Sequence, residues 1–319
     1  MKDLNYAKID KLLRTALDED IGTGDITTIA CVPETAVSSG RFIAKEPGVI
    51  SGLGVLTRVF ELIDESVSVT TLVSDGDTIS TGDIIATISG SSRAILTGER
   101  TALNFLQHMS AIATRTAEAV LEIKETKTKI LDTRKTTPGL RAIEKYAVTC
   151  GGGTNHRYNL ATGVLIKDNH IKAAGGITNA VRQTRLEVTG KGVSPVETEP
   201  ARGHILSGLP DNHSARGSFQ AGIPLSRSPH EIQIEVETET LKQVQEALNA
   251  GADIIMLDNM TPDLMTEAVK LINGRALTEA SGNMGERDLK TIAETGVDYI
   301  SIGALTHSVK AMDISLKFD

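Results

Sequence analysis

The sequence predicts an α/β protein in which a compact β-rich unit precedes an incomplete, open TIM-like α/β barrel. Between residues 40 and 90, short apolar stretches are separated by Gly, Asp and Ser. After Lys129, strand-like and helix-like segments alternate, which is typical of a parallel sheet with crossover helices. A length of 319 residues fits one large domain or two ordinary ones. We therefore expect domains at 1–115 and 116–300, and a C-terminal segment, 301–319, that packs back on the first domain.

The N-terminal part begins with an amphipathic helix. Its apolar residues follow the i, i+3, i+4, i+7, i+8 spacing and are Ile9, Leu12, Leu13, Ala16 and Leu17. Gly22 ends this helix. Strands are expected at 42–44, 67–69 and 84–88. From about Glu99, apolar and small residues mark one side of a long helix, which we expect to link the two domains.

The barrel is expected to contain six strands and five intervening helices. The strands are 129–132, 164–167, 232–237, 253–257, 275–278 and 298–302, and the helices are 139–148, 177–187, 241–249, 262–272 and 286–294. Six βα units are fewer than the eight of a closed barrel, so an open barrel is expected. Residues 188–231 carry five of the nine prolines and no helical or strand period, which predicts an irregular insertion.

Composition excludes several classes of protein. The chain has 33 basic and 41 acidic residues, a net charge of −8, and only 3% aromatic residues, which argues against a nucleic-acid binder. Two cysteines, Cys31 and Cys150, exclude a disulfide framework and a cysteine-based zinc site. The N-terminus lacks the layout of a signal peptide, and no apolar run approaches the roughly 18 residues of a membrane span. We expect a cytoplasmic protein that acts on small molecules.

Basic residues concentrate where the predicted barrel would have its mouth. Residues just past the strand ends of such a barrel converge on one face, which is where these enzymes act. From 129 to 172 there are eight basic and three acidic residues, although the whole chain is acidic. Arg134 and Lys135, Arg157, and Lys167 stand at strand ends or in a Gly-flanked loop, whereas Arg141 and Lys145 fit a solvated helix face. The concentration predicts a substrate with several negative groups.

Two carboxylates end successive predicted strands. Glu237 and Asp258 should therefore lie near each other at the mouth. Two carboxylates beside a phosphate-rich ligand favour Mg²⁺, which takes one or two protein oxygens and shares those of the substrate. The structural alternative is a pair of salt bridges to the basic residues.

Small-residue turns follow the last two predicted strands. Ser281, Gly282 and Asn283, before a helix expected from Glu286, offer backbone N–H groups to a phosphate. Gly303 provides a second turn, and the last two loops are the common phosphate site of such barrels.

Taken together, these motifs resemble the quinolinate phosphoribosyltransferase family, also called nicotinate-nucleotide pyrophosphorylase (carboxylating). The matching segments are EDIGTGDIT (19–27), GERTALN (98–104), DTRKTTPG (132–139), GGGTNHRYN (151–159), KDNHI (167–171), EVE (235–237), LDN (257–259), EASGN (279–283) and DYISIGALTHS (298–308). The resemblance implies an N-terminal α/β-sandwich domain plus an open α/β barrel. It also implies phosphoribosyl transfer from phosphoribosyl pyrophosphate to quinolinate with decarboxylation, which gives nicotinate mononucleotide without an organic cofactor.

The resemblance further implies roles for individual residues. The quinolinate-binding residues of the family are matched by Arg134, His156, Arg157 and Lys167, with Lys135 in the same site. Its Mg²⁺ and ribose contacts are matched by Glu237 and Asp258. Its 5′-phosphate loops are matched by Ser281, Gly282, Asn283 and Gly303. Arg100 resembles an arginine that enters the neighbouring subunit's site, which implies a homodimer.

Two alternatives stay open. A paralogue of the same fold associated with molybdate transport would take another acceptor, although the basic set of Arg134, Lys135, Arg157 and Lys167 favours quinolinate. Residues 73–90 also resemble a lipoyl or biotinyl carrier module, but the lysine that such carriers modify is missing between Val49 and Ser92.

Overall fold

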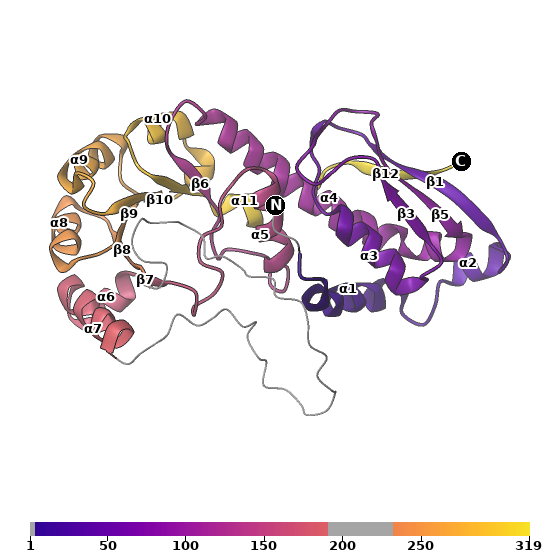
Figure 1. Ribbon diagram of the computed structural model, residues 1–319, viewed down its shortest axis with the longest axis horizontal. Helices are drawn as coiled ribbons and strands as arrows, with labels where there is room; N and C mark the ends of the chain where they lie inside the picture. The colour runs from indigo at the N-terminus through magenta and orange to yellow at the C-terminus, as the bar shows by residue number, and fades with distance from the viewer. Residues whose placement is uncertain (1–3, 191–231) are drawn as a thin grey trace. The chain divides into compact units, whose positions relative to one another are not determined.

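The computed structural model describes residues 4–190 and 232–319, which form two compact units (Figure 1). Unit 1 comprises Met1–Lys124, Lys135–Thr154 and Gly303–Asp319, and unit 2 comprises Glu125–Arg134 and Asn155–Ile302. The domain ranges 1–115, 116–300 and 301–319 stay a prediction, and the compact units interleave along the chain because 135–154 groups with unit 1. Among the described helices, none combines the length and the apolar character that a bilayer crossing needs.

Unit 1 is built around an antiparallel sheet with the strand order β12-β1-β5-β3. Its elements are α1 (Tyr6–Ile21), α2 (Ile26–Cys31), β1 (Val37–Ala44), β2 (Gly48–Val49), α3 (Leu53–Ile63), β3 (Ser68–Thr71), β4 (Thr78–Ile79), β5 (Ile84–Ser91), α4 (Ser92–Glu122), α5 (Arg141–Cys150), α11 (Ala304–His307) and β12 (Ile314–Phe318). The C-terminal strand β12 pairs with β1, with Gly40 opposite Phe318. The long helix α4 begins at Ser92, ahead of the expected start near Glu99.

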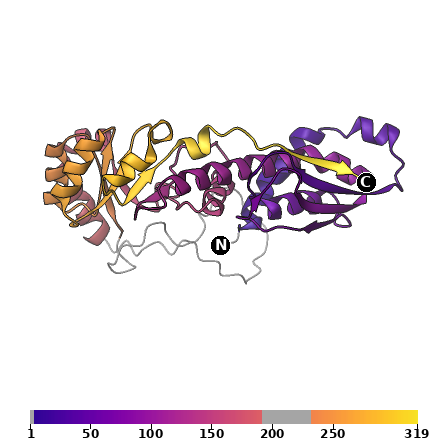
Figure 2. The same cartoon turned by 90° about the horizontal axis from the view of Figure 1, so that it is seen from above.

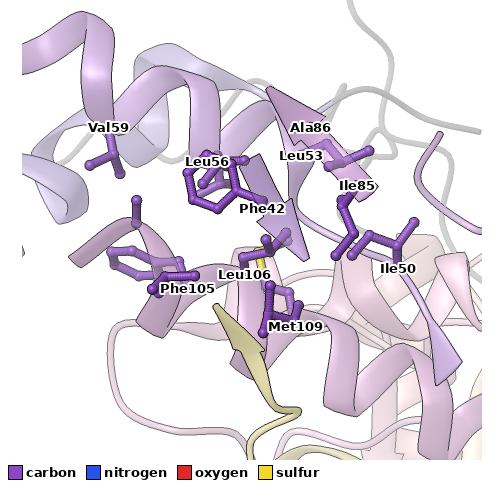
Figure 3. Packing of buried hydrophobic residues seen from close by; sticks show 14 of the residues in the cluster. Phe42, Ile50, Leu53, Leu56, Val59, Ile85, Ala86, Phe105, Leu106 and Met109 are labelled. Carbon is purple, nitrogen blue, oxygen red and sulfur yellow. The ribbon is translucent and has the colours of Figure 1, made fainter. Parts of the chain in front are cut away.

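The core of unit 1 is apolar (Figure 3). Phe42 and Ile85 of the sheet and Leu56 and Phe60 of α3 are fully buried, and α4 adds Leu106. The rings of Phe42 and Phe60 pack with centroids 6.3 Å apart and planes tilted by 54°. Burial of this kind is the main source of stability, so unit 1 has the interior of an ordinary folded domain.

Unit 2 contains the open barrel. Its elements are β6 (Lys129–Leu131), β7 (Val164–Ile166), α6 (Asp168–Ala174), α7 (Ile177–Gly190), β8 (Ile234–Thr238), α8 (Leu241–Ala250), β9 (Ile254–Asp258), α9 (Pro262–Ile272), β10 (Leu277–Ser281), the 3₁₀ turn η1 (Met284–Glu286), α10 (Leu289–Glu294) and β11 (Tyr299–Ser301). All strands are parallel, in the order β6-β11-β10-β9-β8-β7, so the first two strands stand at opposite edges. The predicted open α/β barrel is confirmed, and α8, α9 and α10 line one side of its sheet (Figures 1 and 2).

Several predicted bounds in unit 2 are wrong. The strand expected at 275–278 is β10, Leu277–Ser281, because Arg275 is bonded to the end of α9 through its N–H and guanidinium. The helix expected at 286–294 begins at Leu289, since the Asp288 side chain accepts the first free N–H groups. Helix α6 was not expected, because its sequence follows a strand directly. Of the expected insertion, 188–190 belong to α7 and the rest lies outside the described residues.

Candidate active site

One face of the sheet in unit 2 carries the acidic residues, and we call it the inner face. Strand register pairs Glu237 and Glu279 with Met256, and Ser281 with Asp258. Since paired residues share a face and side chains alternate along a strand, Glu235, Glu237, Asp258, Glu279 and Ser281 all project from the inner face. The alternate positions of these strands, Val236, Ile255, Leu257, Thr278 and Ala280, are buried.

The inner face has two layers. Glu237, Asp258 and Ser281 stand at the carboxyl ends of their strands and are partly exposed. Glu235 and Glu279 stand two residues earlier and are 3% and 0% exposed. Two residues of strand correspond to about 6.6 Å, so a buried acidic layer underlies the carboxyl-end layer.

In the carboxyl-end layer, each carboxylate contacts a polar neighbour. Lys167 Nζ lies 2.6 Å from Glu237 Oε2, and Asn259 Nδ2 donates to Asp258 Oδ2 at 2.7 Å. The ion pair is one of the salt bridges that the sequence left open as an alternative to metal binding. Carboxylates at the ends of adjacent strands, partly exposed, are nevertheless a hard-oxygen donor set that fits Mg²⁺.

Asn259 holds the turn after β10. Gly282 has φ +100°, and a Cβ there would lie 2.8 Å from the Asn259 backbone N, so a side chain is excluded. The Asn259 N–H donates to Ser281 O at 2.9 Å. Asn259 and Asn283 both have positive φ, which is uncommon for residues other than Gly and often marks a functional turn. Of the LDN motif, only Asp258 was predicted as a site residue, although Asn tolerates this conformation better than most residues other than Gly.

His156, Glu235 and Glu279 form a buried cluster. His156 Nε2 lies 3.0 Å from Glu235 Oε2 and 3.5 Å from Glu279 Oε2, and His156 is 7% exposed. Its Nδ1 accepts the Arg157 N–H at 2.7 Å. Within the described residues, Glu235 Oε1 and both Glu279 oxygens accept no hydrogen bond. Neither acid was predicted as a site residue, although they stand two residues before Glu237 and Ser281 in the motifs EVE and EASGN.

Two influences act on the His156 ring. Burial lowers its pKa, but the carboxylates of Glu279 and Glu235 outweigh burial and raise the pKa to about 10. The contact at Nδ1 favours the neutral ring, because a ring nitrogen that accepts an N–H carries no proton itself. The Nδ1 contact selects the neutral tautomer that is protonated on Nε2, and the imidazolium also carries a proton there. Nε2–H therefore faces the carboxylates in both protonation states.

Arg134 and Arg157 form a cationic pair in unit 2. Burial and the nearby Arg134 guanidinium lower the pKa of Arg157, whereas Glu235 raises it. Arg157 Nη1 also donates to Gly163 O at 3.1 Å, which fixes the side chain against its own loop. Two guanidinium groups that repel each other favour an anion as their common partner.

The remaining predicted residues lie in unit 1. Thr306 Oγ1 donates to Lys135 O at 2.7 Å. A Cβ on Gly303 would lie 3.0 Å from Lys135 Cδ and 3.2 Å from His307 Nε2, so these three residues are neighbours. Arg100 is exposed on α4.

Comparison with known proteins decides the family. Residues 25–110 match the model "Quinolinate phosphoribosyl transferase, N-terminal domain", and residues 112–202 and 209–317 match the corresponding C-terminal domain. The chain belongs to the quinolinate phosphoribosyltransferase family. A probable nicotinate-nucleotide pyrophosphorylase [carboxylating] of Bacillus subtilis (strain 168) is 41% identical over 313 residues, which cover 98% of this chain and 94% of that protein. The chloroplastic enzyme of Arabidopsis thaliana is 40% identical and covers 97% of this chain and 82% of that protein.

Solved structures agree with the fold of a quinolinate phosphoribosyltransferase. NadC from Streptococcus pyogenes is 39% identical, with a TM-score of 0.82 over 99% of this chain and 98% of that one. The protein from Francisella tularensis has a TM-score of 0.83 at 35% identity over 100% of this chain and 98% of that one. Residues 73–90, which resemble a carrier module, lie within the family's N-terminal domain.

Proposed function

We propose that this chain transfers the phosphoribosyl group of phosphoribosyl pyrophosphate to quinolinate and decarboxylates the product to nicotinate mononucleotide. Family membership and the names of its relatives support the reaction. The structural observation that carries the proposal is the inner face of unit 2, where Glu237 and Asp258 end adjacent strands and Lys167 Nζ lies 2.6 Å from Glu237 Oε2. Cations suit the acceptor, and carboxylates suit the metal and ribose of the donor.

The acceptor is held by its two carboxylates. Quinolinate carries them on adjacent ring carbons, and Arg134, Arg157 and Lys167 are the cations proposed to bind them. His156 and Lys135 stay predicted members of the acceptor site. Lys167 then exchanges its contact with Glu237 for a substrate carboxylate. Held in this way, the ring nitrogen is aimed at the ribose carbon, and such positioning is most of the catalysis.

The donor is held at the carboxyl-end layer. Glu237 and Asp258 would hold Mg²⁺, which when bound neutralises charge on the pyrophosphate. The turn at Ser281, Gly282 and Asn283 is proposed to bind the 5′-phosphate through backbone N–H groups, and Gly303 stays a predicted contact of the same phosphate. As the bond from ribose to pyrophosphate breaks, Glu237 and Asp258 stabilise the positive charge that develops on the sugar.

Decarboxylation then needs no organic cofactor. Once the ring nitrogen bonds to the ribose carbon, it carries a positive charge. That charge stabilises the electron pair left on the adjacent carbon when the bond to its carboxylate breaks and CO₂ departs. A proton then takes up the electron pair and gives nicotinate mononucleotide.

The site is proposed to be shared in a homodimer. Arg100 is exposed on α4 and would enter the site of a second copy. Arg100→Ala and Lys135→Ala should each be inactive, and mixed subunits should regain activity because one site then has both native residues. Verified heterodimers without recovery would exclude the shared site. A cytoplasmic location stays a prediction.

The direct test is incubation with quinolinate, phosphoribosyl pyrophosphate and Mg²⁺. Nicotinate mononucleotide and CO₂ are expected in equal amounts. Nicotinic acid serves as the control acceptor and should react poorly, because it lacks the second carboxylate that the cations hold. Equal turnover of nicotinic acid would contradict the assignment of quinolinate, and chelation of Mg²⁺ without loss of rate would contradict the metal.

A further inference from the structure

Both nitrogens of the His156 ring lie against protein groups. Nδ1 accepts the N–H of Arg157, and Nε2 lies against the carboxylates of Glu235 and Glu279. The backbone N–H of His156 donates to Asp132 Oδ1 at 2.8 Å. Protein groups therefore surround this residue, and only 7% of its surface is exposed. These contacts describe an anchor for its loop.

The buried cluster is costly for the fold. Glu279 is fully buried, yet neither of its oxygens accepts a hydrogen bond from the described residues. A buried carboxylate without such partners destabilises a protein, and an apolar or neutral residue in its place is often neutral or stabilising. Glu235 is nearly as buried and stands beside it. A group that costs stability and stands directly beneath a binding site is better explained by function.

We propose that Glu235 and Glu279 are positioning residues that hold the His156 ring and, through it, place the Arg157 guanidinium in the acceptor site. The link runs from the two carboxylates to Nε2, and from Nδ1 to the backbone N–H of Arg157. This inference rests on the proposed function, since it assigns Arg157 to the quinolinate site.

A metal ion is the competing explanation for the cluster. One ligand atom from each of the three residues lies within 4.8 Å of the others. A separation of 3.0 Å between Nε2 and Oε2 fits either a shared proton or two ligands of one metal ion, so the metal content of the purified protein decides between them. An imidazole with two carboxylates would also suit a transition metal better than Mg²⁺.

The test compares Glu279→Gln and Glu235→Gln with the matched control Glu239→Gln, an exposed residue just past the end of β8. We expect the first two variants to raise the KM for quinolinate about 10-fold or more, the loss typical of one charged contact, with kcat within about 3-fold. The KM for phosphoribosyl pyrophosphate should stay unchanged. Calorimetry with quinolinate alone should show the same loss of affinity, and the melting temperature should stay the same or rise.

A double-mutant cycle separates positioning from other roles. If Glu279 acts through His156, adding Glu279→Gln to His156→Gln should change the KM for quinolinate by less than about 2-fold. In ¹⁵N-labelled parent protein, His156 should keep its Nε2 proton from pH 6 to 8, and this resonance should move in Glu279→Gln. Should Glu279→Gln fail to fold, Glu235→Gln and the His156→Gln cycle decide the question.

Several outcomes would overturn the inference. A lower melting temperature with unchanged KM for quinolinate would make the cluster structural. Additive effects of Glu279→Gln and His156→Gln on that KM would make Glu279 independent of His156. One equivalent of bound metal in the purified protein would make the cluster a metal site. The parent enzyme is assayed first. An inactive parent refutes the proposed function, whereas an active parent with unaffected variants refutes only the inference.

Discussion

The two large sheets of this protein use their buried faces differently. In unit 1, the sheet packs apolar side chains such as Phe42 and Ile85 against α3 and α4. In unit 2, the inner face carries Glu235 and Glu237 on β8 and Glu279 on β10, the two strands that flank β9. Burial of an apolar face stabilises the fold, whereas burial of a carboxylate destabilises it. The contrast indicates that the inner face of unit 2 is shaped by the chemistry it performs.

The two units also differ in how they treat a buried glutamate that lies beside a histidine. In unit 1, Glu144 is fully buried, but Oε1 lies 3.0 Å from His108 Nε2 and Oε2 accepts the Thr137 N–H at 3.0 Å. In unit 2, Glu279 has no such hydrogen bond from the described residues. Burial of an acid is therefore not in itself a sign of function. The informative feature is a buried acid whose oxygens the fold does not satisfy.

The largest effect is expected from the apolar sheet. Phe42→Ala should lower the free energy of unfolding by about 3–5 kcal/mol, because it leaves a cavity in a fully buried layer. The folded fraction should keep its KM values. Urea denaturation followed by circular dichroism measures the loss, and Phe318→Ala on β12, where the ring is partly exposed, is the control that should cost much less. If the KM for quinolinate changed in folded Phe42→Ala, the division of roles between the sheets would be wrong.

The next effect concerns the inner face. Lys167→Met keeps the length of the side chain but removes its charge, and we expect kcat/KM for quinolinate to fall about 10- to 100-fold, which corresponds to a charged contact of about 1.5–3 kcal/mol. The free energy of unfolding should change by less than about 1 kcal/mol because Lys167 is half exposed. Lys172→Met breaks the exposed pair with Asp168 on the same segment and should leave kinetics intact. Equal kinetic losses in both variants would contradict a specific role for Lys167.

The architecture was easier to predict from the sequence than the buried acidic layer of the site. Periodicity located all six barrel strands, because apolar strand segments separated by helices leave a clear pattern. It misplaced β10, where Arg275 caps the preceding helix and a charged residue, Glu279, lies inside the strand. Strand patterns assume apolar buried positions, so Glu235 and Glu279 were missed for the same reason. Only strand register shows that they lie under Glu237 and Ser281.

A moderate effect should follow a change at the turn after β10. Gly282→Ala places a Cβ against Asn259 at φ +100°, which should cost about 1–3 kcal/mol and raise the KM for phosphoribosyl pyrophosphate while the KM for quinolinate stays near its parent value. Gly251→Ala is the matched control, because Gly251 has φ +85° with nothing within 4 Å. The control should lose stability only. A higher KM for phosphoribosyl pyrophosphate in both variants would show that strain at any such position disturbs the site.

The smallest effect is expected from one charge pair in unit 1, Arg58 and Asp10, which should act on stability alone. Arg58 donates to both oxygens of Asp10 at 2.9 and 2.7 Å and joins α3 to α1. Hydrogen bonds from Arg58 lower the pKa of Asp10 below its usual 3.8, against a smaller opposing effect of burial. Because the folded pKa is lowered, the pair's contribution is complete above about pH 4 and is lost as the pH falls through the folded pKa.

Arg58→Met should therefore lower the free energy of unfolding at pH 7 by about 0.2–1 kcal/mol, the range of pairs near the surface. The difference from the parent should shrink as the pH falls below about 4, since Asp10 becomes protonated in both proteins. Urea titrations at a series of pH values measure this convergence, and Arg115→Met, which breaks an exposed pair within α4, is the control expected to lose less at pH 7. A difference between Arg58→Met and the parent that stays constant down to pH 2 would mean that Arg58 stabilises unit 1 by packing. A change in the KM for quinolinate would mean that the pair between Arg58 and Asp10 also affects the acceptor site, and the functional division between the two sheets would have to be abandoned.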